Sequence, residues 1–426
     1  MRIELPYGHG TVSADVPERL SLEYLMPPPG VPAEDPVSEV AHALDNPLGN
    51  PLVPEAAGGL RVAIAVNDKT RPVPHGELLP PLLRRLEARG VERQNITLII
   101  ATGTHPPMPV SEYADILPRE VVGHYRVLCH DAYDEANLVE LGTTSRGTPC
   151  TLNGVYARAD YRIVVGNIEP HQFMGFSGGV KSAAIGLAGA RTVNANHALM
   201  SEREARLGVY EDNPARSDVE ELGSMVGVDF ALNAVLTQDK RIVRVFAGNP
   251  TKVMEAGIPE VLDLCTVPVE TPYDAMLISP GGHPKDINIY QSQKGLAHAA
   301  AASRPAAPFV LVAACPDGAG SEHYARWVAE RGSHEQVLED FSEMQFEVGP
   351  HKAFQIARDL AGREFRLVTD MSQALCRRVL LEKSDTFQTA IDEIIAPLSS
   401  GARIGVLPRA NVTIPRLGGT GQERIP

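Results

Sequence analysis

The sequence predicts an α/β protein of two domains, each with a mostly parallel sheet flanked by helices. Apolar, β-branched runs alternate with helical patterns along most of the chain, and this alternation favours parallel sheets. The length of 426 residues also exceeds what one hydrophobic core usually supports. Ligands of open α/β sheets bind beyond the carboxyl ends of the strands, so polar residues there are the candidates for function. We also expect the active site to lie in the cleft between the two domains.

The first domain is predicted over residues 1–267 and begins with a proline-rich segment that holds one short helical pattern, 37–47. A helix is predicted over 75–90, interrupted near Pro80 and Pro81 because proline lacks a backbone donor. Three apolar runs that end in polar residues are predicted strands, and two further runs are predicted to form a hairpin: 61–68, 95–105, 161–171, 229–237 and 241–249.

A second α/β cycle starts near residue 270, so the boundary is predicted within 264–274. The second domain then covers residues 268–426 and includes a C-terminal tail. Its predicted elements alternate between a strand with a glycine-rich turn and a helix: 273–286, 290–303, 308–320 and 321–332.

The bulk composition excludes several classes of partner. The net charge is −14, from 39 basic and 53 acidic side chains, which argues against nucleic-acid and anionic-membrane binding because both need a basic surface. The start of the chain has no secretory pattern, and no run approaches the ~18 apolar residues of a spanning helix. The five cysteines are scattered without a C-x-x-C pair. We therefore expect a reduced, cytoplasmic protein.

Polar residues follow each predicted strand of the first domain. Asp68 and Arg71 lie after the first strand, His105 after the second and His171 after the third. A guanidinium at such a place suits a carboxylate ligand, although an Asp–Arg pair that caps a turn explains Asp68 and Arg71 equally well. Two histidines at corresponding strand ends suit acid–base chemistry near neutral pH, whereas a lone histidine is more often structural.

The stretch "FSGGVKS" at 176–182 resembles an anion-binding turn at the start of a helix. It departs from the Walker pattern, because two adjacent glycines precede Val180, Lys181 and Ser182. His197 follows on a predicted helix and by spacing alone is a structural residue.

In the second domain, "GGHPKDINIYQSQKG" is dense in hydrogen-bond donors, including His283 and Lys285. Tyr290 and Lys294 share one helix face, with Gln291 beside them. A solvated start of a helix explains the same pattern, so the residues alone leave this alternative open.

Eight stretches, in this order, resemble the nickel-dependent lactate racemase family over nearly the whole chain: "ALDNPLGNP", "NDKTRP", "ATGTHPPM", "NIEPHQFMGFSGGVKS", "NANHALM", "GGHPKDINIYQSQKG", "CPDGAGS" and "GPHKAFQIAR". No one stretch is decisive, but eight in order are hard to obtain by chance. The resemblance implies an isomerase that inverts C2 of a 2-hydroxy acid. It also implies a host that supplies the enzymes of cofactor biosynthesis.

The family binds a nickel pincer nucleotide, a pyridinium mononucleotide with two sulfur-containing arms. The resemblance implies that Lys181 holds it covalently as a thioamide and that His197 completes the square plane of Ni(II). The other three donors, two sulfurs and a ring carbon, come from the cofactor, and such soft donors suit Ni(II). Contacts to the cofactor are also expected from four further residues: Asp68, Ser177, Gly178 and Gly179.

The C2–H of a 2-hydroxy acid is too weakly acidic for a side chain to remove at neutral pH. Hydride transfer to an electrophilic ring, through a 2-keto acid, avoids this difficulty. The resemblance implies that His105 and His171 are the two catalytic bases and that Arg71 holds the carboxylate. The resemblance also implies that Gln291 and Lys294 are catalytic residues that polarise the substrate, and Tyr290, next to them, is expected to bind it.

Phe354, in "GPHKAFQIAR", stands where lactate racemase has tryptophan in the pocket. The smaller ring leaves space for a substrate other than lactate. Relatives in the family act on malate, aromatic hydroxy acids and sugar acids, so the resemblance leaves the identity of the 2-hydroxy acid open.

Two other functions are compatible with parts of the sequence. A nucleotide- or sugar-phosphate-binding phosphotransferase would use "SGGVKS" as its phosphate loop, but no convincing acidic pair for Mg²⁺ lies close to it. A non-catalytic relative that stores the cofactor would need only Lys181 and His197, and the presence of both His105 and His171 argues against storage.

Overall fold

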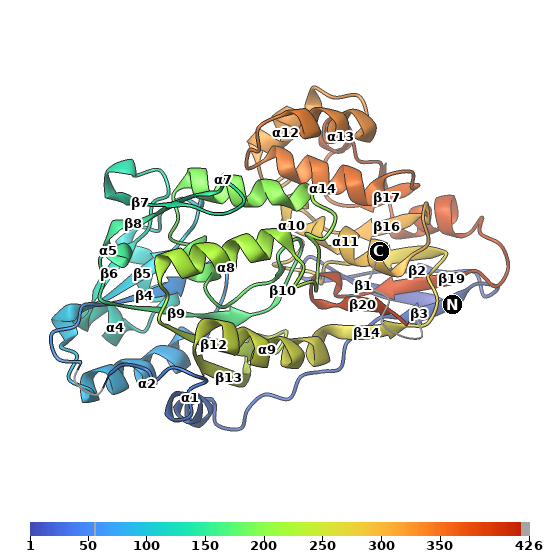
Figure 1. Cartoon of the computed structure of the whole chain (residues 1–426). Coiled ribbons are helices and arrows are strands. Elements are labelled where there is room, and N and C mark those ends of the chain that lie inside the picture. The colour runs from blue at the N-terminus through green and yellow to red at the C-terminus, as the bar shows by residue number, and fades with distance from the viewer. Residues whose placement is uncertain (55–56, 419–426) are drawn as a thin grey trace. The chain divides into compact units, whose positions relative to one another are not determined.

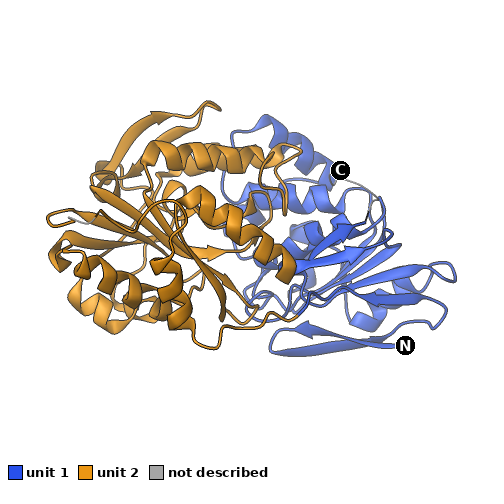
Figure 2. Cartoon of the chain, turned by 60° about the horizontal axis from the view of Figure 1, so that its bottom comes forward, with its two compact units in different colours: residues 1–28, 265–426 blue, residues 29–264 orange. Residues whose placement is uncertain are grey.

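The computed structural model describes residues 1–54 and 57–418, and the chain divides into two compact units (Figure 2). Unit 2 spans residues 29–264. Unit 1 combines residues 1–28 with the described residues from 265 onward. Each unit is an α/β fold with a mainly parallel sheet, which confirms the predicted fold class.

This division differs from the predicted domains, 1–267 and 268–426, in the placement of the N-terminal segment. That segment belongs to unit 1 because β3 (Ser21–Tyr24) pairs in parallel with β19 (Arg403–Leu407). The predicted C-terminal tail includes residues 419–426, which lie outside the described residues.

The sheet of unit 2 has the order β13-β12-β9-β4-β5-β6 (Figure 1). Neighbouring strands are parallel except β12 and β13, which form the predicted hairpin. The four inner strands β12, β9, β4 and β5 are almost continuously buried runs, as expected where helices cover both faces of a parallel sheet. Their bounds are β4 Val62–Asn67, β5 Ile96–Ala101, β6 Arg126–Cys129, β9 Tyr161–Ile168, β12 Phe230–Leu236 and β13 Ile242–Gly248.

Helices α1 (Pro36–Asp45) and α2 (His75–Ala88) share one buried core with strand residues such as Ile64. The predicted break of the second helix is wrong, because α2 continues through Pro80 and Pro81. Each interior proline costs about 3 kcal/mol, whereas each fully buried leucine contributes about 1.5–3 kcal/mol. The buried leucines of α2 offset both prolines: Leu78, Leu79, Leu82, Leu83 and Leu86.

The sheet of unit 1 has the order β18-β17-β16-β15-β19-β3, with every neighbouring pair parallel. Its central strands are β15 (Ala275–Ile278) and β16 (Phe309–Val312). Residues 1–15, read from sequence only as part of a proline-rich segment, form a hairpin of β1 (Arg2–Tyr7) and β2 (Gly10–Asp15).

The helix predicted over 290–303 is divided into α10 (Ile289–Ser292) and α11 (Lys294–Ala302). Helices of eight, ten and eleven residues follow in this unit: α12 Glu322–Ala329, α13 His334–Glu343 and α14 Pro350–Leu360. Across the described ranges, no helix has both the length and the apolar character needed to cross a membrane.

Candidate active site

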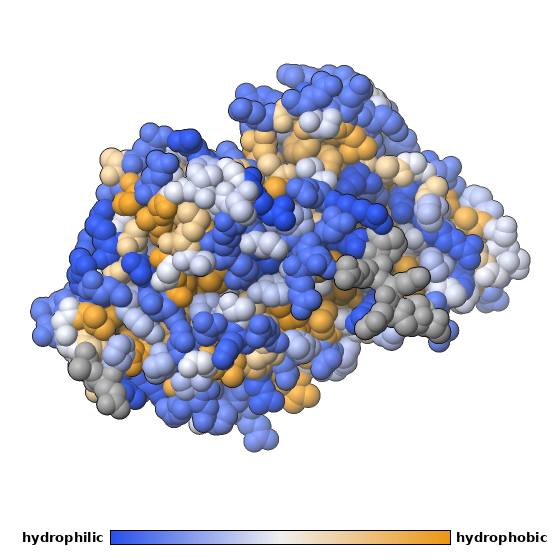
Figure 3. All heavy atoms as spheres, in the orientation of Figure 1, coloured by the Kyte–Doolittle hydropathy of each residue, from blue (hydrophilic) through white to orange (hydrophobic). Residues whose placement is uncertain are grey.

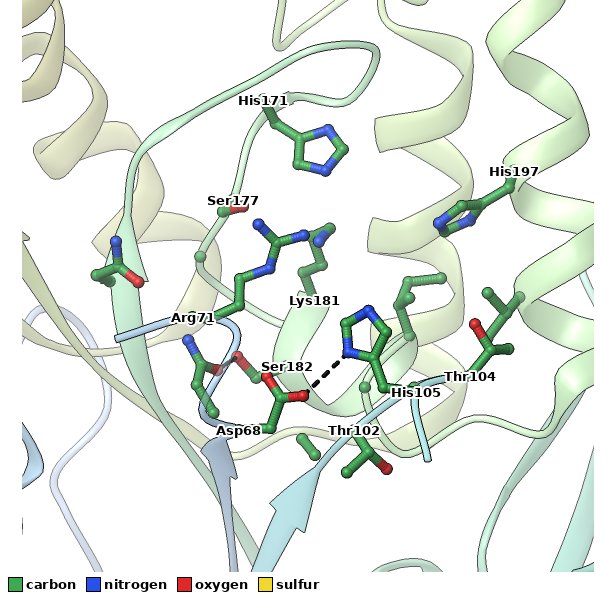
Figure 4. A pocket seen from close by; sticks show the side chains of 18 residues that line it. Asp68, Arg71, Thr102, Thr104, His105, His171, Ser177, Lys181, Ser182 and His197 are labelled. Atoms are coloured by element: carbon green, nitrogen blue, oxygen red, sulfur yellow. Dashed lines mark hydrogen bonds and ion pairs between the residues drawn. The ribbon is translucent and has the colours of Figure 1, made fainter. Parts of the chain in front are cut away.

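Polar side chains from neighbouring strand ends of unit 2 surround a cavity of about 120 Å³ (Figure 4). Strands β9, β4 and β5 are adjacent and parallel, so their carboxyl ends meet at one edge of the sheet. The cavity lining brings together eight residues predicted from the sequence: Asp68, Arg71, His105, His171, Ser177, Gly178, Lys181 and His197.

Asp68 orients His105 from the end of β4. Its Oδ2 lies 3.0 Å from His105 Nδ1, and its Oδ1 accepts a hydrogen bond from the Thr70 hydroxyl at 2.7 Å. The Asp68 side chain is only 4% exposed, whereas that of His105 is 51% exposed. Burial raises the pKa of Asp68, but the hydrogen bonds with His105 and Thr70 outweigh it, so the pKa lies below its ordinary value. The carboxylate therefore stays ionised near neutral pH and faces Nδ1 of the histidine.

His171 is held differently. It ends β10 (Pro170–His171), which forms a short hairpin with β11 (Gly175–Phe176). Its Nδ1 accepts a hydrogen bond from the Met174 amide at 3.3 Å. Phe173 packs edge-on against His171 with ring centroids 4.9 Å apart, and the same ring lies 5.1 Å from that of His197. The two histidines thus come from separate strand ends and have different Nδ1 partners.

The Ser-Gly-Gly turn after β11 requires its glycines. Gly178 has φ +97° and Gly179 has φ +58°, both in the region that favours glycine. A Cβ at Gly178 would lie 2.9 Å from Ile168 Cγ1. The Gly179 amide donates to Asn233 Oδ1 at 2.7 Å. Gly179 therefore shapes the turn, whereas Ser177 and Gly178 line the cavity.

Lys181 begins α6 (Lys181–Ala184) directly after this turn, and His197 lies in the last turn of α7 (Ala190–Ala198). Figure 4 shows both side chains directed into the cavity from these separate elements. Among the residues that the structure describes, no group of three His, Cys, Asp or Glu side chains could hold a metal ion.

Arg71 lines the same cavity with its side chain 36% exposed. Its Nη1 lies 3.8 Å from Glu169 Oε1, while Lys240 Nζ lies 2.9 Å from Glu169 Oε2. The contact with Arg71 is too long for a hydrogen bond. Glu169 thus pairs closely with Lys240, and the Arg71 guanidinium keeps the planar donor geometry that suits a carboxylate ligand.

Unit 1 presents its predicted residues on helices. Lys294 Nζ donates to Gln291 Oε1 at 2.6 Å across the junction of α10 and α11. The Tyr290 ring packs edge-on against His351 with centroids 5.8 Å apart. Burial raises the pKa of Tyr290 to about 12, so its hydroxyl stays protonated near neutral pH.

Phe354 lies on α14 and stacks on Phe341 of α13, with ring centroids 4.7 Å apart and an angle of 20° between the planes. The guanidinium carbon of Arg358 lies 5.9 Å from the Phe354 ring centroid. Figure 3 shows hydrophobic side chains gathered over these two helices. Phe354 therefore belongs to an aromatic cluster of unit 1.

The sequence did not lead us to the buried polar residues that lie near the candidate residues of each unit. Lys352, 6% exposed, donates to Gln355 Oε1 at 2.8 Å, and its Nζ lies 5.0 Å from the Tyr290 ring centroid. In unit 2, Arg216 and Asp218 are almost fully buried on one helix. The available signal was the presence of charged residues at positions that an amphipathic helix buries.

Two histidines, a guanidinium and a lysine thus line one cavity at the edge of a parallel sheet, in an α/β protein whose site carries side chains of the kind used in acid–base chemistry. Residues 7–208 match the family model described as the lactate racemase N-terminal domain, and residues 269–414 match the lactate racemase C-terminal domain. The chain belongs to the lactate racemase family and is an isomerase of that family. The resemblance seen in the eight sequence stretches is thereby confirmed.

Individual relatives agree with this assignment. The chain is 32% identical to the lactate racemase of Thermoanaerobacterium thermosaccharolyticum, over 86% of this chain and 88% of that protein. It is 30% identical to the lactate racemase of Lactiplantibacillus plantarum, over 95% of this chain and 97% of that protein.

Solved structures show the same fold. The lactate racemase apoprotein from Thermoanaerobacterium thermosaccharolyticum is similar with a TM-score of 0.89 and 29% identity, over 98% of this chain and 100% of that chain. A Thermotoga maritima crystal structure shares only the fold, with a TM-score of 0.65 and 17% identity, over 91% of this chain and 100% of that chain.

Proposed function

We propose that this chain inverts C2 of a 2-hydroxy acid and uses a nickel pincer nucleotide as its cofactor. One observation carries the proposal: a single cavity of unit 2 is lined by Lys181, His197, Arg71, His105 and His171. The first two are the residues expected to hold the cofactor. Arg71 suits the carboxylate of the substrate, and the two histidines suit its hydroxyl proton.

The residues present fit this cofactor. Lys181 supplies an amine for a covalent tether, and His197 supplies one nitrogen of the kind that square-planar nickel accepts. Ser177 Oγ is buried and has no hydrogen-bond partner among the described residues, so it suits a polar group of the nucleotide. When bound, the cofactor would accept and return a hydride, which is chemistry that no side chain provides.

The protein's own residues then handle the carboxylate and the proton. Arg71 would hold the substrate carboxylate through paired hydrogen bonds. His105 would exchange the hydroxyl proton through Nε2, because its Nδ1 faces Asp68. The ionised Asp68 would stabilise the imidazolium that forms when His105 takes the proton. His171 would exchange the proton on the opposite face of the planar 2-keto acid.

For unit 1 the proposal rests on the family resemblance. Gln291 and Lys294 would polarise the substrate oxygen, and their mutual hydrogen bond fixes the orientation of the amide. Tyr290, protonated near neutral pH, would donate a hydrogen bond to the substrate. Phe354 occupies less volume than the tryptophan of lactate racemase, so we propose a substrate larger than lactate or different in shape.

A phosphotransferase with "SGGVKS" as its phosphate loop has less support. The Ser177 amide donates to the Glu169 carbonyl at 2.8 Å, and the Gly179 amide donates to Asn233 Oδ1. A phosphate loop directs such amides at its ligand. Two donors of this turn are instead engaged within the protein.

The test is a panel of 2-hydroxy acids covering lactate, malate, aromatic and sugar acids. Each enantiomer is incubated with protein co-expressed with the cofactor-making enzymes, and the products are resolved by chiral chromatography. We expect interconversion of at least one pair, and none with protein made without those enzymes. Retention of configuration in every acid by loaded protein would contradict the proposed function.

A further inference from the structure

We infer that helix α8 (Pro214–Val226) sets the spacing between Lys181 and His197, the two residues by which this chain would hold its cofactor. The inference rests on the proposed function. It follows from the contacts of α8 with two other segments of unit 2. One is the Ser-Gly-Gly turn that leads into Lys181, and the other is helix α7, which carries His197.

Arg216 of α8 holds the turn. Its side chain is 1% exposed, and Nη1 donates to the carbonyls of Phe176 and Gly178, both at 3.2 Å. Nη2 donates to the same Gly178 carbonyl at 3.2 Å. Nε donates to Glu220 Oε1 at 2.8 Å, so the buried charge is balanced. The planar guanidinium thereby holds the backbone on both sides of Ser177, which a point charge such as lysine does less well.

The same helix meets the turn again two helical turns later. A Cβ at Gly223 would lie 2.5 Å from the Cβ of Val180, the residue before Lys181. A side chain at Gly223 would therefore push Val180 and the start of α6 away from α8.

Asp218 of α8 holds α7. It is fully buried, and its Oδ2 accepts a hydrogen bond from Asn196 Nδ2 at 2.8 Å. Its Oδ1 accepts another from the Thr144 hydroxyl at 2.6 Å. Asn196 Nδ2 also donates to the Ala215 carbonyl at 3.0 Å. Because Asn196 directly precedes His197, these bonds fix the turn of α7 from which His197 projects.

Arg216, Asp218 and Gly223 lie outside the cavity lining, so they act as positioning residues. A covalent tether and a metal ligand must both reach one rigid, planar cofactor. Metal–ligand distances tolerate deviations of only about 0.2 Å. Two segments anchored to the same helix keep their spacing better than two segments anchored separately.

The test uses protein co-expressed with the cofactor-making enzymes. Intact mass gives the adduct on Lys181, and elemental analysis with the visible spectrum gives nickel per adduct. We expect Asp218→Ala to retain the adduct and to carry less nickel per adduct, because a ligand histidine that loses its supporting partner typically loses about 10-fold or more in metal affinity. Asp218→Asn can still accept a hydrogen bond from Asn196, so its nickel per adduct should be close to that of the wild type. Arg216→Lys should lower the yield of adduct itself.

Val219→Ala is the matched control, because Val219 is a fully buried apolar residue of the same helix. It should lower the unfolding temperature without changing adduct yield or nickel per adduct. His197→Ala sets the lower limit for nickel per adduct.

Two results would overturn the role of α8. One is wild-type adduct and nickel in both Asp218→Ala and Arg216→Lys. The other is a loss in all variants, Val219→Ala included, that follows the loss of stability alone. A wild-type protein that carries no adduct on Lys181 would instead overturn the proposed function, and this inference with it.

Discussion

The two units are both built around six-stranded, mainly parallel sheets, yet they present their functional side chains in different ways. In unit 2, polar and charged side chains follow the ends of adjacent strands, and the Asp68 carboxylate lies within hydrogen-bond distance of His105 Nδ1 there. In unit 1, the corresponding residues lie on helices, and Lys294 donates to an amide, Gln291. Strand ends of one sheet hold acid–base groups at fixed mutual positions, whereas the helices of unit 1 present hydrogen-bond donors and an aromatic cluster.

This difference predicts that the two units contribute to different parts of the reaction. Changes in the unit 2 cavity should remove the cofactor or the proton transfer, and so lower turnover. Changes in the aromatic cluster of unit 1 around Phe354 should alter mainly the choice of the 2-hydroxy acid. The experiments below test this division, beginning with the largest expected effect.

Lys181→Ala should abolish both the covalent adduct and activity, because no other cavity residue predicted from the sequence offers an amine for the tether. The measurement is intact mass of protein co-expressed with the cofactor-making enzymes. Lys252→Ala, a change of an exposed lysine on α9 (Pro250–Cys265) of unit 2, is the control and should keep the adduct. An adduct of unchanged mass in Lys181→Ala would contradict the assignment.

His105→Ala and His171→Ala should each lower turnover on the order of 10²-fold or more, the usual size of lost acid–base catalysis. The loss should appear from both enantiomers, because inversion passes through both histidines whichever enantiomer is the substrate. His124→Ala removes an exposed histidine at the end of α4 (Arg119–His124) and should have no effect.

Single turnovers sharpen this test. In each variant one enantiomer should still be oxidised, so the 2-keto acid should accumulate from that enantiomer. The enantiomer that gives the keto acid should differ between the two variants. Quenched reactions analysed for keto acid give this preference directly. Near-wild-type inversion by either variant would leave that histidine with a structural role only.

Asp68→Asn should lower turnover by about 10- to 100-fold, the usual cost of losing a group that orients a functional histidine. It should also change the pH dependence of stability. The pKa of Asp68 is lowered in the folded state, so its carboxylate stabilises the fold above the unfolded-state pKa. That contribution is lost as the pH falls through the lowered folded-state pKa. The variant should therefore lose less stability than the wild type on acidification, measured by unfolding temperature against pH.

Asp160→Asn is the matched control. The Arg61 side chain holds the pKa of Asp160 below its usual range as well, but Asp160 lies outside the cavity lining. Asp160→Asn should also lose less stability than the wild type on acidification, but its turnover should be unchanged. Unchanged turnover in Asp68→Asn would remove Asp68 from the proton-transfer step.

Local patterns were enough to predict five strands of the unit 2 sheet, because each is an apolar run whose neighbours in sequence mark where it ends. The edge strand β6 was not predicted, because it is short and none of its residues is fully buried. Partners distant in the sequence were not predictable in this way. β3 lies some 380 positions before β19, its partner in the sheet of unit 1. The burial of Arg216 and Asp218 depends on the turn and the helix that they contact, and neither is adjacent in sequence.

The smallest expected effect concerns Phe354 of unit 1. Phe354→Trp should shift relative kcat/KM toward lactate and away from larger 2-hydroxy acids by roughly 10-fold, the size of discrimination that one or two extra carbons in a pocket produce. The indole must share the space in which Phe354 stacks on Phe341, so it should narrow the room left for a substrate. The measurement is kcat/KM for lactate and for the best acid of the panel. Phe354→Leu removes the stack without adding volume, so it should not favour lactate. An equal change for both acids in Phe354→Trp would show that this residue supports unit 1 without selecting the substrate, and the proposed division between the units would then lose its basis in unit 1.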